Sequence, residues 1–186
     1  MRSSIAIILF LFLAAASAEV VDRIAVAVGN RAIKENQIDR EIRLTDFLNG
    51  APLDLGSASK HQAAERLIDQ TLIRAEMAKS SYPTPSEAEI AGVLSKIKQA
   101  RFRNNGEYEQ ALKTYGTSEP ELKTHIAWQL QVLRFVDIRF EPAVQTQAVK
   151  NAKQPPLGER VNAAFFAWLD ESRKRSRIQF HDEVFQ

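Results

Sequence analysis

Cysteine is absent from the 186-residue sequence, and several other features are scarce. Without a thiol, the chain cannot form disulfides, use a thiolate nucleophile or bind a metal through sulfur. Seven glycines and seven prolines are few for this length, which disfavours an all-β fold with many turns. Beyond the first residues, no apolar run approaches the roughly 20 residues that a membrane-spanning helix needs. These absences favour a mainly helical protein.

Motifs for catalysis are also missing. The sequence has no phosphate-binding loop, no glycine-rich dinucleotide motif and no serine elbow of the hydrolase type. Its three histidines, His61, His125 and His181, fall on separate predicted elements without the short spacing of metal ligands. Acidic pairs near helix starts are explained by capping and by the helix dipole. We therefore predict no catalytic residue, no metal site and no cofactor.

The charge of the chain is nearly balanced, with 25 basic and 23 acidic residues. A nucleic-acid-binding domain normally has a concentrated basic face. Here the densest basic cluster is residues 173–177, at the end of a predicted helix. We interpret it as a solvated helix end favoured by the dipole, with contact to anionic lipid or nucleic acid as the alternative. We predict no nucleic-acid partner.

The first 18 residues have the order of a secretory signal peptide. Arg2 gives a positive start, residues 5–13 form an apolar run, and Ala16 and Ala18 are small residues typical of a cleavage site. We expect cleavage after Ala18, export to the bacterial periplasm and no integral membrane segment in the mature chain. An uncleaved membrane anchor is the alternative.

The mature chain opens with a predicted β-hairpin. Residues 20–28 are rich in β-branched side chains, Gly29-Asn30 is a turn pair, and residues 31–33 can form a short return strand. A helix is expected to follow, with Asn36 as its N-cap, and to end near Asn49.

Apolar residues then recur at helical spacing over most of the chain. This pattern predicts further helices over residues 59–79, from a Thr84-Pro85-Ser86-Glu87 capping box to Asn104, around residues 108–115, and over 119–140 and 159–175. In the helix over 119–140 the apolar stripe includes Leu133 and Ile138, so we expect burial on more than one side.

The composition changes over residues 141–158, which contain Pro142, Pro155 and Pro156 and few large apolar residues. We interpret this stretch as a linker. The alternation in residues 178–181 predicts a final strand.

Several segments, in this order, resemble SurA-type periplasmic chaperones. Residues 20–30 (Val-Val-Asp-Arg-Ile-Ala-Val-Ala-Val-Gly-Asn) are similar to the start of their N-terminal domain, with Gly29 as a departure. Residues 65–73 resemble its second helix, and residues 85–90 the start of its third. Trp168-Leu169, followed by a basic patch and the segment 178–180, resembles the C-terminal helix and strand that fold back on that domain.

The resemblance implies a mainly α fold with a small sheet formed by the N-terminal hairpin and a C-terminal strand. Residues 19–140 would be the helical chaperone domain, and residues 159–186 would pack back on it. Members of this family usually carry parvulin-type prolyl isomerase domains between the two pieces. Residues 141–158 are too few for one, because domains below about 40 residues rarely fold alone. We therefore expect a protein that is not an enzyme.

The leading hypothesis is an ATP-independent holdase for unfolded polypeptides, with outer-membrane proteins as candidate clients. Such a protein needs exposed apolar surface. The candidate client-binding residues lie next to loops or in short, interrupted helices, where core packing is the alternative: Phe47, Leu48, Phe102, Tyr108 and Tyr115. Two other functions stay open, residual prolyl isomerase activity and assembly of one dedicated envelope partner.

Overall fold

The computed structural model describes residues 22–147 and 155–186, so the predicted signal peptide lies outside the described residues. The expected fold class is confirmed, because six helices and a small sheet make up the chain. In chain order the elements are β1 (Ile24–Val28), β2 (Arg31–Lys34), α1 (Glu35–Asn49), α2 (Ser57–Met77), α3 (Glu87–Arg101), α4 (Asn105–Tyr115), α5 (Glu119–Gln147), α6 (Leu157–Arg175), β3 (Ile178–Phe180) and the short 3-10 helix η2 (Asp182–Val184).

The sheet joins the two ends of the described chain. Its order is β2-β1-β3 and both pairings are antiparallel, with Val26 opposite Phe180. Gly29 makes the turn between β1 and β2 with φ of 60°, a value that glycine adopts without strain. Its backbone N–H also donates to the Arg177 carbonyl over 2.8 Å. The hairpin and the C-terminal strand are therefore held as one unit.

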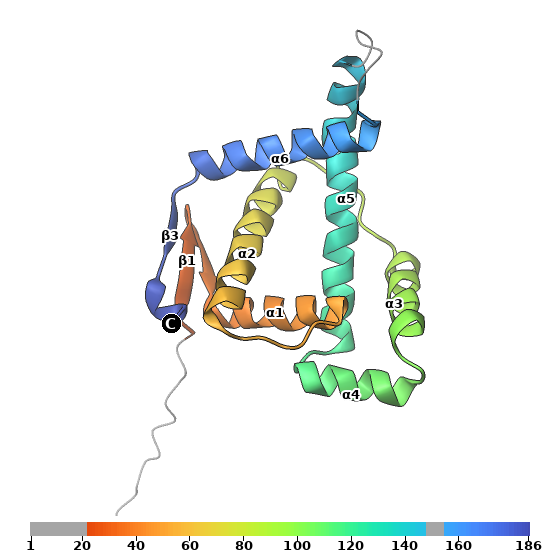
Figure 1. Cartoon of the computed structure of the whole chain (residues 1–186). Helices are drawn as coiled ribbons and strands as arrows, with labels where there is room; N and C mark the ends of the chain where they lie inside the picture. Colours follow the sequence, from red (N-terminus) through yellow and green to blue (C-terminus); the bar gives the residue numbers. More distant parts are fainter. Residues whose placement is uncertain (1–21, 148–154) are drawn as a thin grey trace, which may run out of the picture.

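Four helices form a frame beside the sheet. In Figure 1, α1 and α6 cross the ends of α2 and α5, so that the four make the sides of a rough rectangle. The sheet packs beside α2, whereas α3 and α4 lie outside the frame against α5 and α1. No helix or strand of the described chain runs through the centre of the frame, so only side chains extend into it.

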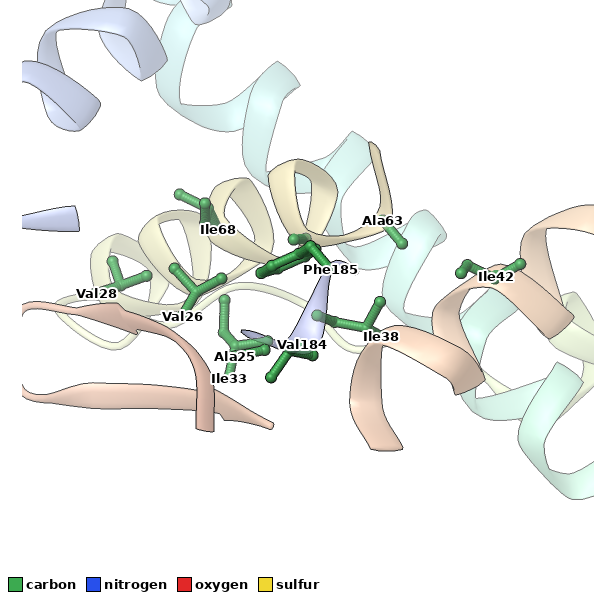
Figure 2. Packing of buried hydrophobic residues seen from close by; sticks show 11 residues of the cluster. Ala25, Val26, Val28, Ile33, Ile38, Ile42, Ala63, Ile68, Val184 and Phe185 are labelled. Carbon is green, nitrogen blue, oxygen red and sulfur yellow. The ribbon is translucent and has the colours of Figure 1, made fainter. Parts of the chain in front are cut away.

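Three apolar clusters hold the structure together. The sheet core lies between the strands, α1 and α2, and includes the C-terminal Val184 and Phe185 (Figure 2). The frame core joins α2, α5 and α6 around Phe135, which is fully buried. The outer core joins α1, α3, α4 and α5 around Phe47, which is also fully buried. Burial of apolar surface, rather than helix propensity, therefore sets the helix arrangement.

Helix α3 begins with a capping box at Ser86 and Glu89, two residues beyond the predicted box at Thr84 and Glu87. The Glu89 N–H donates to Ser86 Oγ over 3.3 Å, and the Ser86 N–H donates to Glu89 Oε2 over 2.8 Å. Arg134 of α5 adds an ion pair to the same carboxylate. These bonds, the one from the Ser86 backbone first, lower the pKa of Glu89 to about 2. The cap thus also ties α3 to α5.

The start of α1 and the end of α5 also differ from the prediction. Helix α1 starts at Glu35, not after Asn36, because Gln37 and Asp22 accept the N–H groups of Lys34 and Asn36 over 2.8 and 3.2 Å. The first-turn donors are thus satisfied without an Asn36 cap.

Helix α5 runs past Phe140 to Gln147, so the first seven residues of the predicted linker are helical. Pro142 removes one backbone donor there. However, Val144 is buried in the frame core against α6, and this burial offsets the loss. The central part of the predicted linker lies outside the described residues.

Glu119 at the start of α5 gives the fold a pH dependence. Its carboxylate accepts hydrogen bonds from Lys98 Nζ over 2.7 Å and from the Tyr108 hydroxyl over 3.2 Å, and Lys123 Nζ lies 3.1 Å away. These contacts, the Lys98 bond first, lower the pKa of Glu119 to about 2. The charged carboxylate therefore stabilises the fold above its ordinary pKa of 4.5, and this contribution is lost as the pH falls toward 2.

We expect Glu119→Gln to lower the free energy of unfolding at pH 7 and to change it much less near pH 2, because about half of the wild-type carboxylate is then protonated. Urea denaturation from pH 7 to about pH 2 measures both curves. Glu109→Gln is the matched control, since Glu109 has no ion pair among the described residues, and its curve should run parallel to that of the wild type. A Glu119→Gln loss of equal size at both pH values would contradict the prediction.

Candidate functional site

The centre of the frame is an open pocket of about 660 Å³, here called the central pocket. All four frame helices contribute side chains to it. Its apolar lining residues are Leu48, Ile73, Trp128, Val132, Leu133, Phe165, Phe166 and Leu169. Its polar and charged lining residues are Glu41, Thr45, Asn49, Arg66, Asp69, Gln70, His125 and Gln129. The pocket side chains from α6 are all apolar, those from α1 and α2 are mostly polar, and α5 contributes both kinds.

Two large apolar side chains of this pocket face solvent. Leu133 on α5 is 60% exposed and Phe166 on α6 is 63% exposed, the highest values among the exposed large apolar residues. Their neighbours Phe135 and Phe165 are buried in the frame core. Each of the two helices thus places one side chain in the frame core and a nearby one on an accessible surface.

The polar side of the pocket is built around Glu41, an acidic side chain that is only 6% exposed. Its carboxylate accepts hydrogen bonds from Arg66 Nε over 3.2 Å, Gln70 Nε2 over 3.3 Å and Thr45 Oγ1 over 3.4 Å. A buried carboxylate requires such partners, because desolvation otherwise opposes its charge. This network joins α1 to α2 across the wall of the pocket.

His125 of α5 faces the same network. Burial lowers the pKa of its imidazole, the Glu41 carboxylate acts in the opposite direction, and Arg66 adds to the lowering. The ring accepts a hydrogen bond at Nε2 from Gln129 Nε2 over 3.0 Å. With burial as the largest influence, the neutral imidazole is favoured at this position.

A second, smaller pocket of about 380 Å³ adjoins the central one and is called the side pocket. The two share Glu41, Gln70, His125 and Trp128 in their linings. The other lining residues of the side pocket are Gln37, Arg40, Leu44, Leu67, Arg74, Pro120, Glu121 and Thr124. We refer to the two adjoining pockets together as the recess; α1, α2 and α5 line both pockets, and α6 lines only the central one.

The five predicted client-binding residues come together in and around the outer core. Phe47 packs against Phe102, Tyr108 and Tyr115, with ring centroids 5.5 to 6.1 Å apart. Phe47 and Tyr108 are buried, so these two cannot contact a client in this structure. The expectation that they lie on an open surface is therefore corrected, because α3, α4 and α5 cover them.

The other three predicted residues, Leu48, Phe102 and Tyr115, are half-buried. Leu48 lines the central pocket, next to the buried Phe47. The Tyr115 hydroxyl donates to the Ala51 carbonyl over 2.6 Å, which gives it a structural role in holding the loop after α1. Their part in client binding stays a prediction.

The prediction missed the two most exposed residues of the central pocket. Leu133 was expected on a buried stripe, as was Ile138, which is 51% exposed. Leu122 and Ile126 of the same stripe are buried in the outer core, whereas Leu133, about three turns beyond Leu122, lies past the helices that cover that core. The adjacent pair Phe165-Phe166 was the one sequence feature that indicated an exposed apolar residue, since neighbouring helical positions cannot face the same side.

Two residues of the basic cluster at the end of α6 form ion pairs within the fold. Arg173 Nε donates to Asp69 Oδ1 over 2.8 Å, and its Nη1 donates to Glu65 Oε2 over 2.7 Å. Lys174 pairs with Asp170 over 2.6 Å on the helix itself. Burial raises the pKa of Asp69 despite the nearby Arg173. Arg173 thus fastens α6 to α2 beside the central pocket.

Over residues 22–147 and 155–186, no group of three or more histidine, cysteine, aspartate or glutamate side chains is arranged to hold a metal ion. Within the same ranges, no helix is both long and apolar enough to cross a membrane.

Comparison with known proteins gives one relationship. The chain is 28% identical to the chaperone SurA of Pseudomonas aeruginosa over 151 residues, which are 77% of this chain and 36% of the relative. The chain thus matches about a third of the length of that chaperone. No protein-family model and no solved structure matches. The similarity supports a relationship with SurA-type proteins, in agreement with the resemblance of the sequence segments.

Proposed function

We propose that the protein is an ATP-independent chaperone that holds unfolded polypeptides in the central pocket. The observation that carries this proposal is the pair Leu133 and Phe166, two exposed apolar side chains on an open pocket with apolar walls. Exposed apolar residues gathered at a hollow, next to charged groups, are typical of binding surfaces. The similarity to a chaperone supports the same function.

The contacts that this pocket offers suit reversible binding. Burying one leucine or phenylalanine side chain contributes about 1.5–3 kcal/mol. Two or three such contacts, reduced by the entropy of ordering the client, give dissociation constants between about micromolar and millimolar. Binding of this strength retains an unfolded chain long enough to oppose aggregation and releases it without an energy source.

We propose further that the protein is exported, as residues 1–18 predict, and that outer-membrane proteins are among its clients. We also propose that it does not catalyse prolyl isomerisation. A proline-peptide isomerisation assay should then show no acceleration over the uncatalysed rate.

The direct test is suppression of aggregation. The purified protein is mixed, without ATP, with an unfolded outer-membrane β-barrel protein at ratios up to equimolar, and light scattering is followed beside an inert protein. We expect suppression that rises with the ratio. A protein that is folded by circular dichroism but gives no suppression would favour a role with one dedicated envelope partner.

The exposed pair provides the sharper prediction. We expect Leu133→Ser with Phe166→Ser to raise the apparent dissociation constant for an unfolded client about tenfold to hundredfold, because both apolar contacts are lost. Titration of a fluorescently labelled client measures this change. The free energy of unfolding should stay within about 0.5 kcal/mol of the wild type, since both residues are exposed.

The matched control is Ile138→Ser with Leu157→Ser. These residues lie on the same two helices and are 51% and 36% exposed, but neither lines the central pocket. Client affinity should be unchanged. If both double variants weakened binding equally, general surface hydrophobicity rather than the central pocket would be responsible.

A further inference from the structure

The side pocket contains an arginine held in an unusual position. The Arg74 guanidinium of α2 lies over the indole of Trp128 of α5, 3.6 Å from the ring centroid. Both residues line the side pocket, and Trp128 also lines the central pocket. A guanidinium stacked by its flat face keeps the N–H donors at its edge free for hydrogen bonds.

Arg74 differs from the other charged side chains of the two pockets. Each of the others forms an ion pair across elements: Glu41 with Arg66, Arg40 with Glu121, and Asp69 with Arg173. In the described part of the chain, no acidic side chain lies within ion-pair distance of Arg74, although the residue is exposed. The recess therefore presents one positive charge that the fold does not neutralise.

The surroundings disfavour that positive charge in the absence of an anion. Partial desolvation lowers the pKa of Arg74, and the like charge of Arg31 lowers it further. Arg31 also has no ion pair within the described ranges. A carboxylate placed at the edge of the Arg74 guanidinium would accept two parallel hydrogen bonds and relieve the repulsion between the two arginines.

We propose that Arg74 binds the carboxylate of an aspartate or glutamate side chain in the polypeptide segment held by the central pocket. This inference rests on the proposed function. The recess would then select segments in which apolar residues, bound along α5 and α6, stand near an acidic residue. A side chain is the suitable source of the carboxylate, because the recess is open and a bound chain need not end in it.

The test uses three fluorescent peptides of one apolar sequence and the full protein. The first peptide carries one glutamate and a C-terminal amide, the second has glutamine in its place, and the third is the glutamine peptide with a free C-terminal carboxylate. We expect the wild type to bind the first peptide about tenfold more tightly than the other two, the usual gain from a charged hydrogen-bonded pair. Fluorescence anisotropy measures the three dissociation constants.

Variants of the protein assign this preference to Arg74. Arg74→Gln should bind all three peptides equally, at the affinity of the wild type for the glutamine peptide. Arg74→Lys should keep only part of the preference, because lysine retains the charge without the planar fork. Arg177→Gln is the matched control: it removes the same charge from an exposed arginine that lines neither pocket, and it should keep the tenfold preference. Thermal unfolding confirms that each variant is folded.

The outcomes separate this inference from the proposed function. Equal binding of the first two peptides, weakened by Leu133→Ser with Phe166→Ser, would overturn the role of Arg74 and leave the chaperone proposal standing. The same tenfold gain with the third peptide would assign the site to chain ends instead of acidic side chains and would overturn the inference. If Arg177→Gln lost the preference for the glutamate peptide as fully as Arg74→Gln, the net charge of the protein and not Arg74 would explain the preference, and the inference would be overturned. No binding of any peptide would overturn both proposals.

Discussion

Replacing Phe47 with alanine is expected to lower the free energy of unfolding by about 3–5 kcal/mol. The Phe47 side chain is fully buried and packs against three aromatic rings of the outer core. Arg101 of α3 also donates to the Phe47 and Leu48 carbonyls at the end of α1, so this residue lies where two helices are joined. Its removal would leave a cavity that α1, α3, α4 and α5 cannot all close.

Phe166→Ala is the matched control, since it makes the same chemical change at a residue that is 63% exposed. It should alter stability by no more than about 0.5 kcal/mol while weakening client binding. Urea denaturation of both variants at pH 7, with client titration, measures this contrast. If Phe47→Ala weakened client binding and left stability unchanged, Phe47 would be a surface residue and the outer core described here would be wrong.

Ending the chain after Arg177 is expected to unfold the protein. The cut removes β3 and the last residues, among them Val184 and Phe185, which are 2% and 3% exposed in the sheet core. Phe185 also stacks on His61 of α2, with centroids 4.3 Å apart. Loss of Phe185 alone corresponds to about 3–5 kcal/mol, and a domain of this kind has only about 5–15 kcal/mol in total.

A chain that lacks only Gln186 is the control, because this residue is exposed and contributes no side chain to the sheet core. It should unfold at the same temperature as the full protein. Circular dichroism and thermal melts distinguish the two truncations. A cooperative melt of the chain that ends at Arg177 would show that the C-terminal segment is an addition to the fold and not part of its core.

Local sequence signals determined much of the secondary structure. A capping box predicts the start of α3, although the structure forms it at Ser86 and Glu89 and not at Thr84 and Glu87. Gly116 follows the predicted end of α4 at residue 115, with φ of 61°. Signals of this kind involve residues within one helical turn, so neighbouring residues suffice to specify them. The mainly α class was predictable from the spacing of apolar residues, whereas the sheet that joins the two ends of the chain was expected from the resemblance to SurA-type chaperones.

Burial could not be predicted in the same way. Ile126 and Leu133 belong to one apolar stripe of α5, yet the first is 1% exposed and the second 60%. Phe47 precedes a loop in the sequence, which favours an exposed client-binding residue, although three helices cover it in the structure. Helical periodicity tells which side chains share a face. It does not tell which other helix, if any, covers that face.

The sequence by itself therefore determined most of the helices, because these follow from short-range hydrogen bonding and from the spacing of apolar residues, while the pairing of the chain ends was expected from the resemblance to SurA-type chaperones. Only the tertiary structure decided which apolar residues became core, which charges were paired and where a recess stayed open. Arg173 reaches Glu65 and Asp69 across the fold, while Arg74 meets only an aromatic ring. That difference depends on how α2, α5 and α6 pack, since contacts between distant segments depend on burial summed over the whole chain.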